Sequence, residues 1–177
     1  MKPLTCPIPS NLNLLQNNGF QFHITKLPDM TYFCTEVPIP SITLPVADIN
    51  TPLSKIPFVG DKIEFGNLTV QFLIDEEMRN FKAIHDWIIM LGFPQLHDQY
   101  KQFINQNMSS LISNEVAASQ SDGVLSILNS ANNVIRTIQY VDIVPVSLEQ
   151  VILTSTTDDT TYLAGVAVFD YNYYKFL

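Results

Sequence analysis

Residues 75–92 read DEEMRNFKAIHDWIIMLG, and this stretch carries the clearest structural pattern in the chain. Its apolar side chains recur at the spacing of three to four residues that marks one face of a helix. The members of this face are Met78, Phe81, Ile84, Ile88 and Leu91, with His85 and Trp87 at its flanks. We therefore expect a helix over Asp75–Gly92 whose apolar face, Trp87 included, packs in the core of a domain.

Both ends of this stretch carry helix-terminating signals. Asp75 is placed to act as the N-cap, because its carboxylate can accept hydrogen bonds from the free backbone N–H groups of the first turn. Glu76 and Glu77 follow where the helix dipole favours negative charge. Gly92 offers a left-handed exit, and Pro94 prevents continuation.

Before this helix the chain has the character of strands. Phe20–Ile24 alternates apolar and polar residues, as a half-buried strand does. Thr31–Val37 is rich in aromatic and β-branched residues, and a turn signal separates the two, so we expect them to form a hairpin. Leu68–Ile74 is a further strand, with its even-numbered residues facing one way.

Between these strands, Pro38–Gly60 combines five prolines with apolar residues. Prolines are tolerated in loops and edge strands but not in central strands, so an extended hairpin or loop is expected. We expect a partner subunit to cover its apolar side chains, since exposed apolar surface of this kind marks interfaces. The alternative is that the loop folds back on its own sheet. The proposed interface residues are Ile42, Leu44, Val46, Ile49, Leu53, Ile56 and Phe58.

After the helix, Asp122–Leu128 and Val134–Val141 form a second hairpin signal, and Pro145 is expected to break the chain. Val151–Leu153 and Leu163–Tyr173 are expected to form the last strand pair. Both faces of the final strand are apolar near its middle, which indicates a central position in the sheet.

The domain organisation follows from these segments. Residues 1–18 contain three prolines and are expected to form an N-terminal arm. Residues 19–177 are expected to form a single β domain, with a polar surface insertion around residues 95–121 that contains a weak helical pattern.

Composition excludes several classes. The chain of 177 residues is 46% hydrophobic, so it can bury a core, and it contains no apolar run long enough to span a bilayer. Its N-terminus lacks the apolar region of a secretory signal. A net charge of −8 disfavours nucleic-acid binding, since an acidic surface gains no affinity from counterion release. Cys6 and Cys34 are expected to be reduced thiols.

No pattern for catalysis or cofactor binding emerges. The three histidines, His23, His85 and His97, lack metal-ligand spacing, and no glycine-rich phosphate loop is present. The acidic pairs Glu76-Glu77 and Asp158-Asp159 have structural reasons to exist, in a helix start and a turn. We therefore predict a protein that is not an enzyme and has no catalytic, metal or cofactor site.

Five segments, in their order along the chain, carry a resemblance to a known family. They are Phe20–Pro40 (FQFHITKLPDMTYFCTEVPIP), Val59–Lys62 (VGDK), Phe72–Pro94 with its D-E…W helix, Val144–Leu148 (VPVSL) and the aromatic strand Phe169–Tyr174. Together they cover nearly all of residues 19–176. The sequence resembles the tail tube proteins of contractile-tailed bacteriophages, a superfamily that includes type VI secretion tube proteins.

The resemblance implies an antiparallel β-barrel or sandwich with one flanking helix. It implies homohexameric rings that stack into the inner tail tube of a virion, assembled in the host cytoplasm. Their strands would close an inner barrel whose acidic lumen lets genomic DNA pass without binding. The implied partners are further copies, the tail sheath and the baseplate, with no membrane insertion.

Two alternatives remain. A tube initiator at the junction of baseplate and tube, or the tube subunit of a related secretion machine, would share the same fold. A β-sandwich carbohydrate-binding module, from another class, would use Tyr171, Tyr173 and Tyr174 as an exposed aromatic platform.

Overall fold

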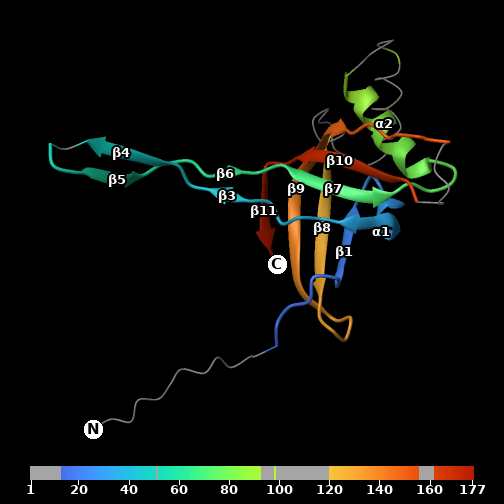
Figure 1. The fold of residues 1–177 in the computed structure, drawn as a ribbon, viewed down its shortest axis with the longest axis horizontal. Helices are drawn as coiled ribbons and strands as arrows, with labels where there is room; N and C mark the ends of the chain where they lie inside the picture. Colours follow the sequence, from blue (N-terminus) through green and yellow to red (C-terminus); the bar gives the residue numbers. More distant parts are fainter. Residues whose placement is uncertain (1–12, 51, 93–97, 99–119, 156–161) are drawn as a thin grey trace, which may run out of the picture.

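In the computed structural model, which describes residues 13–50, 52–92, 98, 120–155 and 162–177, strands dominate. Seven strands form one antiparallel sheet in the order β1-β8-β9-β10-β7-β2, with β11 paired to β9. This sheet curls into a barrel-like body, and α2 lies across one end of it (Figure 1). The mainly β fold with a flanking helix is as expected. No helix of the described residues is long and apolar enough to cross a membrane.

The strands of the body are β1 (Phe20–Ile24), β2 (Cys34–Glu36), β7 (Leu68–Leu73), β8 (Ser121–Leu128), β9 (Val134–Leu148), β10 (Ala164–Asp170) and β11 (Tyr173–Phe176). The helices are α1 (Met30–Phe33) and α2 (Arg79–Gly92). Four further strands form a projection from the body: β3 (Ile42–Thr43), β4 (Val46–Asn50), β5 (Lys55–Val59) and β6 (Glu64–Phe65).

The core lies inside the curled sheet, where inward residues alternate with outward ones. In β7 the even-numbered residues Leu68, Val70 and Phe72 are fully buried, as the alternation predicted. Across the body, Phe22 of β1 packs edge-on against Tyr140 of β9, with ring centroids 6.2 Å apart. These buried aromatic and aliphatic side chains supply most of the driving force for folding.

The long strand β9 serves two parts of the sheet because it bends. Its first half pairs with β8 and β11, and its second half pairs with β10. Asp142 has φ of 58°, and Pro145 lies opposite Phe169 where the register shifts. Pro145 therefore does not break the chain as expected. It stands at an irregular point of the ladder, where the missing N–H costs little.

The first expected hairpin is wrong. A turn of helix, α1, follows β1, and its Met30 is buried in the core. Because α1 redirects the chain, β1 pairs with β8 and β2 pairs with β7. The hairpin β8–β9 does form, with residues 129–133 as its loop.

The last expected pair is also wrong in part. Residues 151–153 are not a strand. β10 lies between β9 and β7, which confirms the central position of the final segment. The chain then turns at Tyr171 and Asn172, so the long strand that was expected is split into β10 and β11.

Helix α2 begins at Arg79, four residues later than expected. Met78 has φ of 53°, and its carbonyl accepts the first helical bond from Lys82 N–H at 2.9 Å. Asp75 does not cap the helix. Asn80 instead ties the start of α2 to the sheet, since its Nδ2 donates to the Leu73 carbonyl at 2.7 Å.

The apolar face of α2 covers the core largely as its spacing indicates. Ile84 and Trp87 are buried, and Phe81, Ile88 and Leu91 are half-buried against the core. Met78 is a correction, because it precedes the helix and is 39% exposed. Gly92 is a second correction, because it belongs to the helix and does not have the positive φ of a left-handed exit.

Candidate assembly surface

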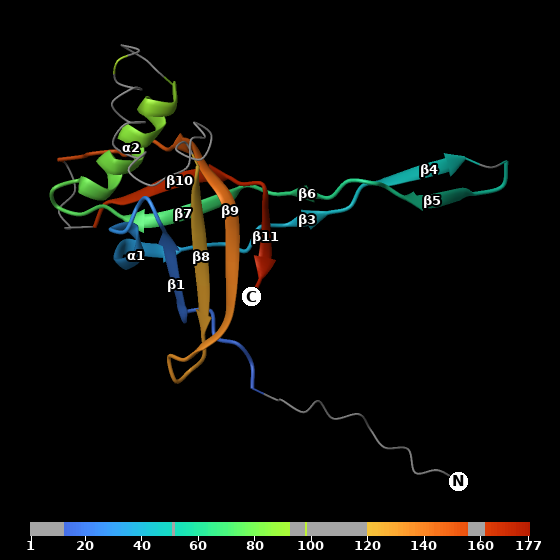
Figure 2. The ribbon, with the colours of Figure 1, turned by 180° about the vertical axis from the view of Figure 1, so that it is seen from behind.

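Residues 38–66 leave the body between β2 and β7 and form a long two-stranded projection, called the arm below (Figures 1 and 2). Near the body its two strands are β3 and β6, paired as Ile42 with Phe65. Further out they are β4 and β5, paired from Val46–Val59 to Asn50–Lys55. An extended hairpin or loop was expected here, and the structure has the hairpin.

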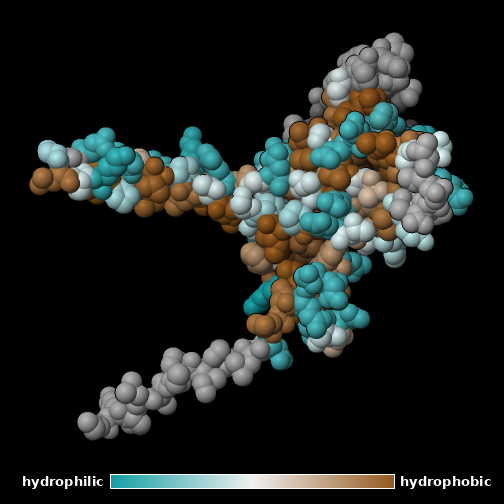
Figure 3. Space-filling model, viewed as in Figure 1, coloured by the Kyte–Doolittle hydropathy of each residue, from teal (hydrophilic) through white to brown (hydrophobic). Residues whose placement is uncertain are grey.

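The pairing register gives the outer arm two different faces. Directly opposed residues of antiparallel strands point to the same side. Ala47 with Phe58, and Ile49 with Ile56, therefore make one apolar face. The opposite face carries Val46, Pro57 and Val59 nearer the body and Asp48, Asn50 and Lys55 towards the tip. Figure 3 shows the same division, with hydrophobic surface along one side of the arm and hydrophilic surface along the other.

Every residue of β3, β4 and β5 is exposed in the isolated chain. Phe58 is 61% exposed and Ile49 51% exposed. A lone two-stranded ribbon is at best marginally stable in water, so an arm of this length with a bare apolar face is a candidate contact surface.

Close backbone approach at the arm's middle depends on Gly60. Its N–H donates to the Pro45 carbonyl at 2.8 Å, and a Cβ at position 60 would lie 2.4 Å from that same oxygen. Only glycine allows the two strands to cross here.

A second candidate surface is provided by the free strand edges of the body. β1, β8, β9 and β11 lie side by side, and β1 and β11 are the outer strands of this group. The alternating hydrogen-bond pattern directs the N–H and C=O groups of Phe20 and Phe22 away from β8. Those of Tyr174 and Phe176 are directed away from β9 in the same way. Such edges are templates for pairing with another strand.

The fold has clear counterparts among solved structures. A chain in the cap of the anti-feeding prophage (the AFP tube terminating cap) matches with a TM-score of 0.59 at 13% identity, covering 100% of this chain and 99% of that one. A chain in the PVC sheath-tube complex of an extracellular contractile injection system matches at 0.57 and 12%, covering 93% and 91%. A chain in the PVC sheath/tube terminator matches at 0.55 and 13%, covering 98% and 99%.

The chain has the tail tube fold. This agrees with the resemblance seen in the sequence. No protein-family model and no curated protein matches the sequence, so the fold likeness is carried by the structure rather than by sequence identity.

All seven residues that were expected at an interface lie on the arm. Six of them lie between the root of the arm and its outer strands, and their side chains are exposed. The seventh, Leu53, is 98% exposed and lies near the tip. Sequence reasoning missed the free edges of β1 and β11, because they depend on which strands pair. The insertion around residues 95–121, residues 1–12, Cys6 and His97 lie largely outside the described residues.

The aromatic platform of a carbohydrate-binding module does not form. Tyr171 is 8% exposed, and Tyr174 is half-buried. Both rings pack against Tyr140, with centroids 5.3 and 5.8 Å away. Of the three tyrosines only Tyr173 is substantially exposed, at 44%.

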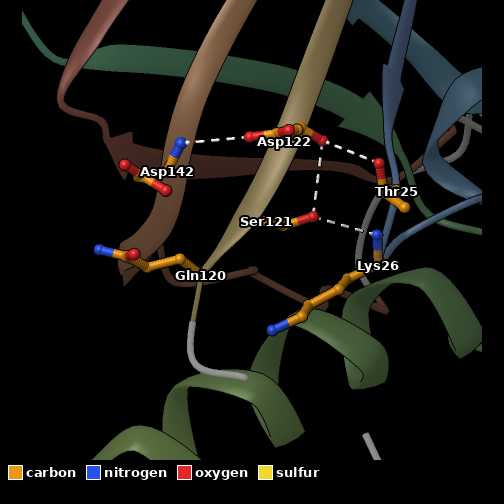
Figure 4. Close-up of a pocket in the computed structure, with 6 residues that line it drawn as sticks. All are labelled: Thr25, Lys26, Gln120, Ser121, Asp122 and Asp142. Carbon is orange, nitrogen blue, oxygen red and sulfur yellow. Dashed lines mark hydrogen bonds between the residues drawn. The ribbon is translucent and has the colours of Figure 1, made fainter. Parts of the chain in front are cut away.

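A small pocket lies near the ends of β1 and β8 and the bend of β9, lined by Thr25, Lys26, Gln120, Ser121, Asp122 and Asp142 (Figure 4). Its polar groups largely bond to one another: Thr25 Oγ1 donates to the Asp122 carbonyl at 3.2 Å, and Asp142 N–H donates to Asp122 Oδ1 at 3.4 Å. Burial lowers the pKa of Lys26 to about 8, and its Nζ lies 5.2 Å from the Trp87 ring centroid. These contacts hold the bend of β9 against β8 and the end of β1, so we assign the pocket a structural role.

Among the described residues Cys34 has a free thiol, and Cys6 lies outside them. The Sγ of Cys34 donates to the Gln71 carbonyl at 3.6 Å, and burial raises its pKa to about 12. A thiol so far from ionisation is a poor nucleophile, which fits packing between β2 and β7 rather than reactivity.

Proposed function

We propose that this protein is a structural subunit of a contractile-tail tube, in which copies close into rings and the rings stack. The observation that carries the proposal is the tail tube fold combined with an arm whose apolar face is uncovered in the isolated chain. The arm would lie on neighbouring copies, which would bury Ile49, Ile56 and Phe58.

Ring closure follows from the direction of the strands. The four strands β1-β8-β9-β11 alternate in direction, so β11 runs opposite to β1. If β1 of one copy lies beside β11 of the next, the new pair is antiparallel, as is every other pair around the ring. A head-to-tail contact of this kind closes into a ring and leaves no free edge. Six copies, as the resemblance implies, would close one barrel.

The outward face of these strands would line the bore. Its middle rows carry the polar residues Gln21, His23, Ser126, Thr137, Gln139 and Lys175 and the apolar Val124. Among the described residues of this face, Lys175 and Asp122, the latter at one end, are the charged side chains. The proposed wall is thus mostly polar and nearly neutral, whereas the resemblance implied an acidic one. DNA would pass because the described residues of this face offer phosphate groups only one cation per copy, Lys175.

In this proposal the protein is part of a phage virion, assembled in the host cytoplasm, and the tube's outer surface meets the sheath while its end meets the baseplate. It is not an enzyme. The alternative within the same fold is a tube initiator or terminator, since two of the matched chains come from a cap and a terminator.

Negative-stain electron microscopy of the purified protein over a concentration series tests the proposal. We expect rings at low concentration and hollow rods at higher concentration. Single rings that never stack would favour the initiator or terminator role. A monomer at every concentration would contradict the tube subunit.

The β1–β11 junction can be tested by cysteine cross-linking in a background without Cys6 and Cys34. Cysteine is placed at Gln21 or His23 in β1, together with cysteine at Tyr173 or Lys175 in β11, which gives four double variants on the bore face. We expect at least one to give, after mild oxidation, a ladder of covalent oligomers whose largest member is the closed ring.

A matched control combines Ser126→Cys with Lys175→Cys. β8 is not an edge strand, so in the proposed ring Ser126 lies two strands from the next copy's β11, roughly 10 Å away. No ladder is expected from this pair. If rods form but none of the four edge pairs cross-links, copies do not join through β1 and β11.

A further inference from the structure

The root of the arm is held by two tyrosines, Tyr171 in the corner between β10 and β11 and Tyr174 within β11. Tyr171 Oη donates to the Gly66 carbonyl at 2.8 Å, and Tyr174 Oη donates to the Pro40 carbonyl at 3.2 Å. Pro40 lies where the outgoing strand of the arm begins, and Gly66 lies where the returning strand ends. One hydroxyl therefore holds each of the two strands at the point where they leave the body.

Side chains packed around these two hydrogen bonds restrict the direction in which the arm leaves the body. Phe65, the last residue of β6, has its ring centroid 6.1 Å from that of Tyr171 and 5.5 Å from that of Tyr174. Gly66 N–H donates to the Ser41 carbonyl at 2.9 Å, and a Cβ on Gly66 would lie 2.7 Å from Ser41 Oγ. The root is thus tightly packed, while every residue of the outer strands β4 and β5 is exposed in the isolated chain.

The same two tyrosines bound the strand that offers a free edge. Tyr171 lies two residues before the start of β11, with Asn172 between, and Tyr174 pairs with Tyr140 within the strand. Any shift of β11 moves both hydroxyls and so moves the root of the arm.

We propose that Tyr171 and Tyr174 are positioning residues that fix the direction of the arm relative to the edge strand β11. The inference deepens the proposed function, since it links the strand that would join copies within a ring to the arm that would contact other copies. A neighbour bound to β11 would hold both hydroxyls still and present the arm in one direction. Binding energy is then not spent on ordering the arm.

The chain offers a matched control in the same aromatic cluster. Tyr140 is fully buried between Phe22, Tyr171 and Tyr174, and its hydroxyl makes no hydrogen bond to the described residues. Tyr140→Phe removes a hydroxyl from the cluster without touching the arm. Tyr171→Phe with Tyr174→Phe removes the two hydroxyls that do.

The direct measurement is the distance between two spin labels on the full chain, diluted to the monomer. One label is placed at Leu53→Cys near the arm tip and one at Ala83→Cys on the exposed side of α2, in a background without Cys6 and Cys34. We expect the distance distribution to broaden in the Tyr171→Phe/Tyr174→Phe variant and to keep its native width in Tyr140→Phe. Far-UV circular dichroism should be native in both.

The second measurement is the concentration at which unlabelled protein begins to assemble. Loss of the two hydrogen bonds should raise this assembly concentration by about tenfold or more, because a loose arm must be ordered on binding. Tyr140→Phe should leave it unchanged.

The outcomes separate this inference from the proposed function. If wild type assembles and the double variant matches it in both measurements, the positioning role is wrong and the tube function stands. If Tyr140→Phe behaves like the double variant, the role is equally wrong. If the double variant does not fold, Tyr171→Phe and Tyr174→Phe are measured singly, and a native label width in both contradicts the role. If wild type never assembles, the tube function fails, while the label distances still decide whether the hydroxyls hold the arm.

Discussion

Replacing Leu44, Ile49 and Ile56 together by threonine should leave a folded monomer that no longer assembles. These side chains are 45%, 51% and 49% exposed, so the body loses no core contact. Threonine is β-branched and keeps the strand propensity of the arm. Substitutions at exposed positions of this kind change the free energy of unfolding by about 0.5 kcal/mol or less.

The effect on assembly should be far larger. Burying a large aliphatic side chain fully contributes about 1.5–3 kcal/mol, and each of these has roughly half its surface still to bury. Three such residues contribute about 3 kcal/mol per contact, which corresponds to at least about a 100-fold rise in the concentration needed for assembly. Sedimentation velocity and electron microscopy over a concentration series measure this directly.

The other face of the arm supplies the control. Asp48→Thr with Lys55→Thr removes an exposed ion pair, whose Oδ2 and Nζ atoms are 3.9 Å apart, and adds no apolar surface. Such a pair contributes little, so assembly should be close to that of wild type. Intact rings in the triple variant would show that the apolar face is not the contact. Equal loss in both variants would mean that both faces are covered.

The arm and α2 could be predicted from sequence because their signals are local. Prolines interleaved with apolar residues exclude a central strand wherever the rest of the chain goes, and the helical spacing of Phe81, Ile84 and Ile88 depends only on neighbouring turns. The alternation in β7 is local in the same sense. Each of these segments would have the same pattern in any arrangement of the other strands.

The partners of the strands could not be predicted in this way. Residues 38–66 separate β2 from β7, its neighbour in the sheet, and a turn of helix separates β1 from β2. The register of β8 against β9 depends on a bulge near Asp142, a non-glycine residue with positive φ. Side-chain alternation says which face is buried but not which strand lies alongside.

The start of α2 shows how tertiary contacts override a good local signal. Asp75 is a favourable capping residue followed by two glutamates, yet the helix begins only after Met78. Asn80 is buried, and its side chain bonds both to the Leu73 carbonyl and to Phe81 N–H. Satisfying this buried amide fixes where the helix can begin, because an unpaired buried polar group is costly. The tyrosine contacts at the arm root were missed for a similar reason, since they join residues about a hundred positions apart.

Trp87→Ala should destabilise the body by about 3–5 kcal/mol, as expected for removing a large buried aromatic side chain and leaving a cavity. Trp87 is 4% exposed, and its ring centroid is 6.5 Å from that of Phe169 in β10. Lys26 Nζ lies over the Trp87 ring, 5.2 Å from its centroid. Trp87 therefore joins α2 to the sheet. Because it is the only tryptophan, urea unfolding of the variant is followed by far-UV circular dichroism. The measurement is made below the concentration at which copies assemble, since association would add its own stabilisation.

His85→Ala is the matched control on the same helix, because His85 is exposed and its loss should change the free energy of unfolding by about 0.5 kcal/mol or less. A loss below about 1 kcal/mol in Trp87→Ala would mean that α2 contributes little to the body. Comparing Trp87→Ala with the arm variant separates the effect on stability from the effect on assembly. Trp87→Ala that remains folded at low temperature should still assemble, because α2 is separate from the arm and from both free edges. The arm variant should keep full stability and lose assembly, so the two substitutions divide the chain into a part that holds the fold and a part that joins copies.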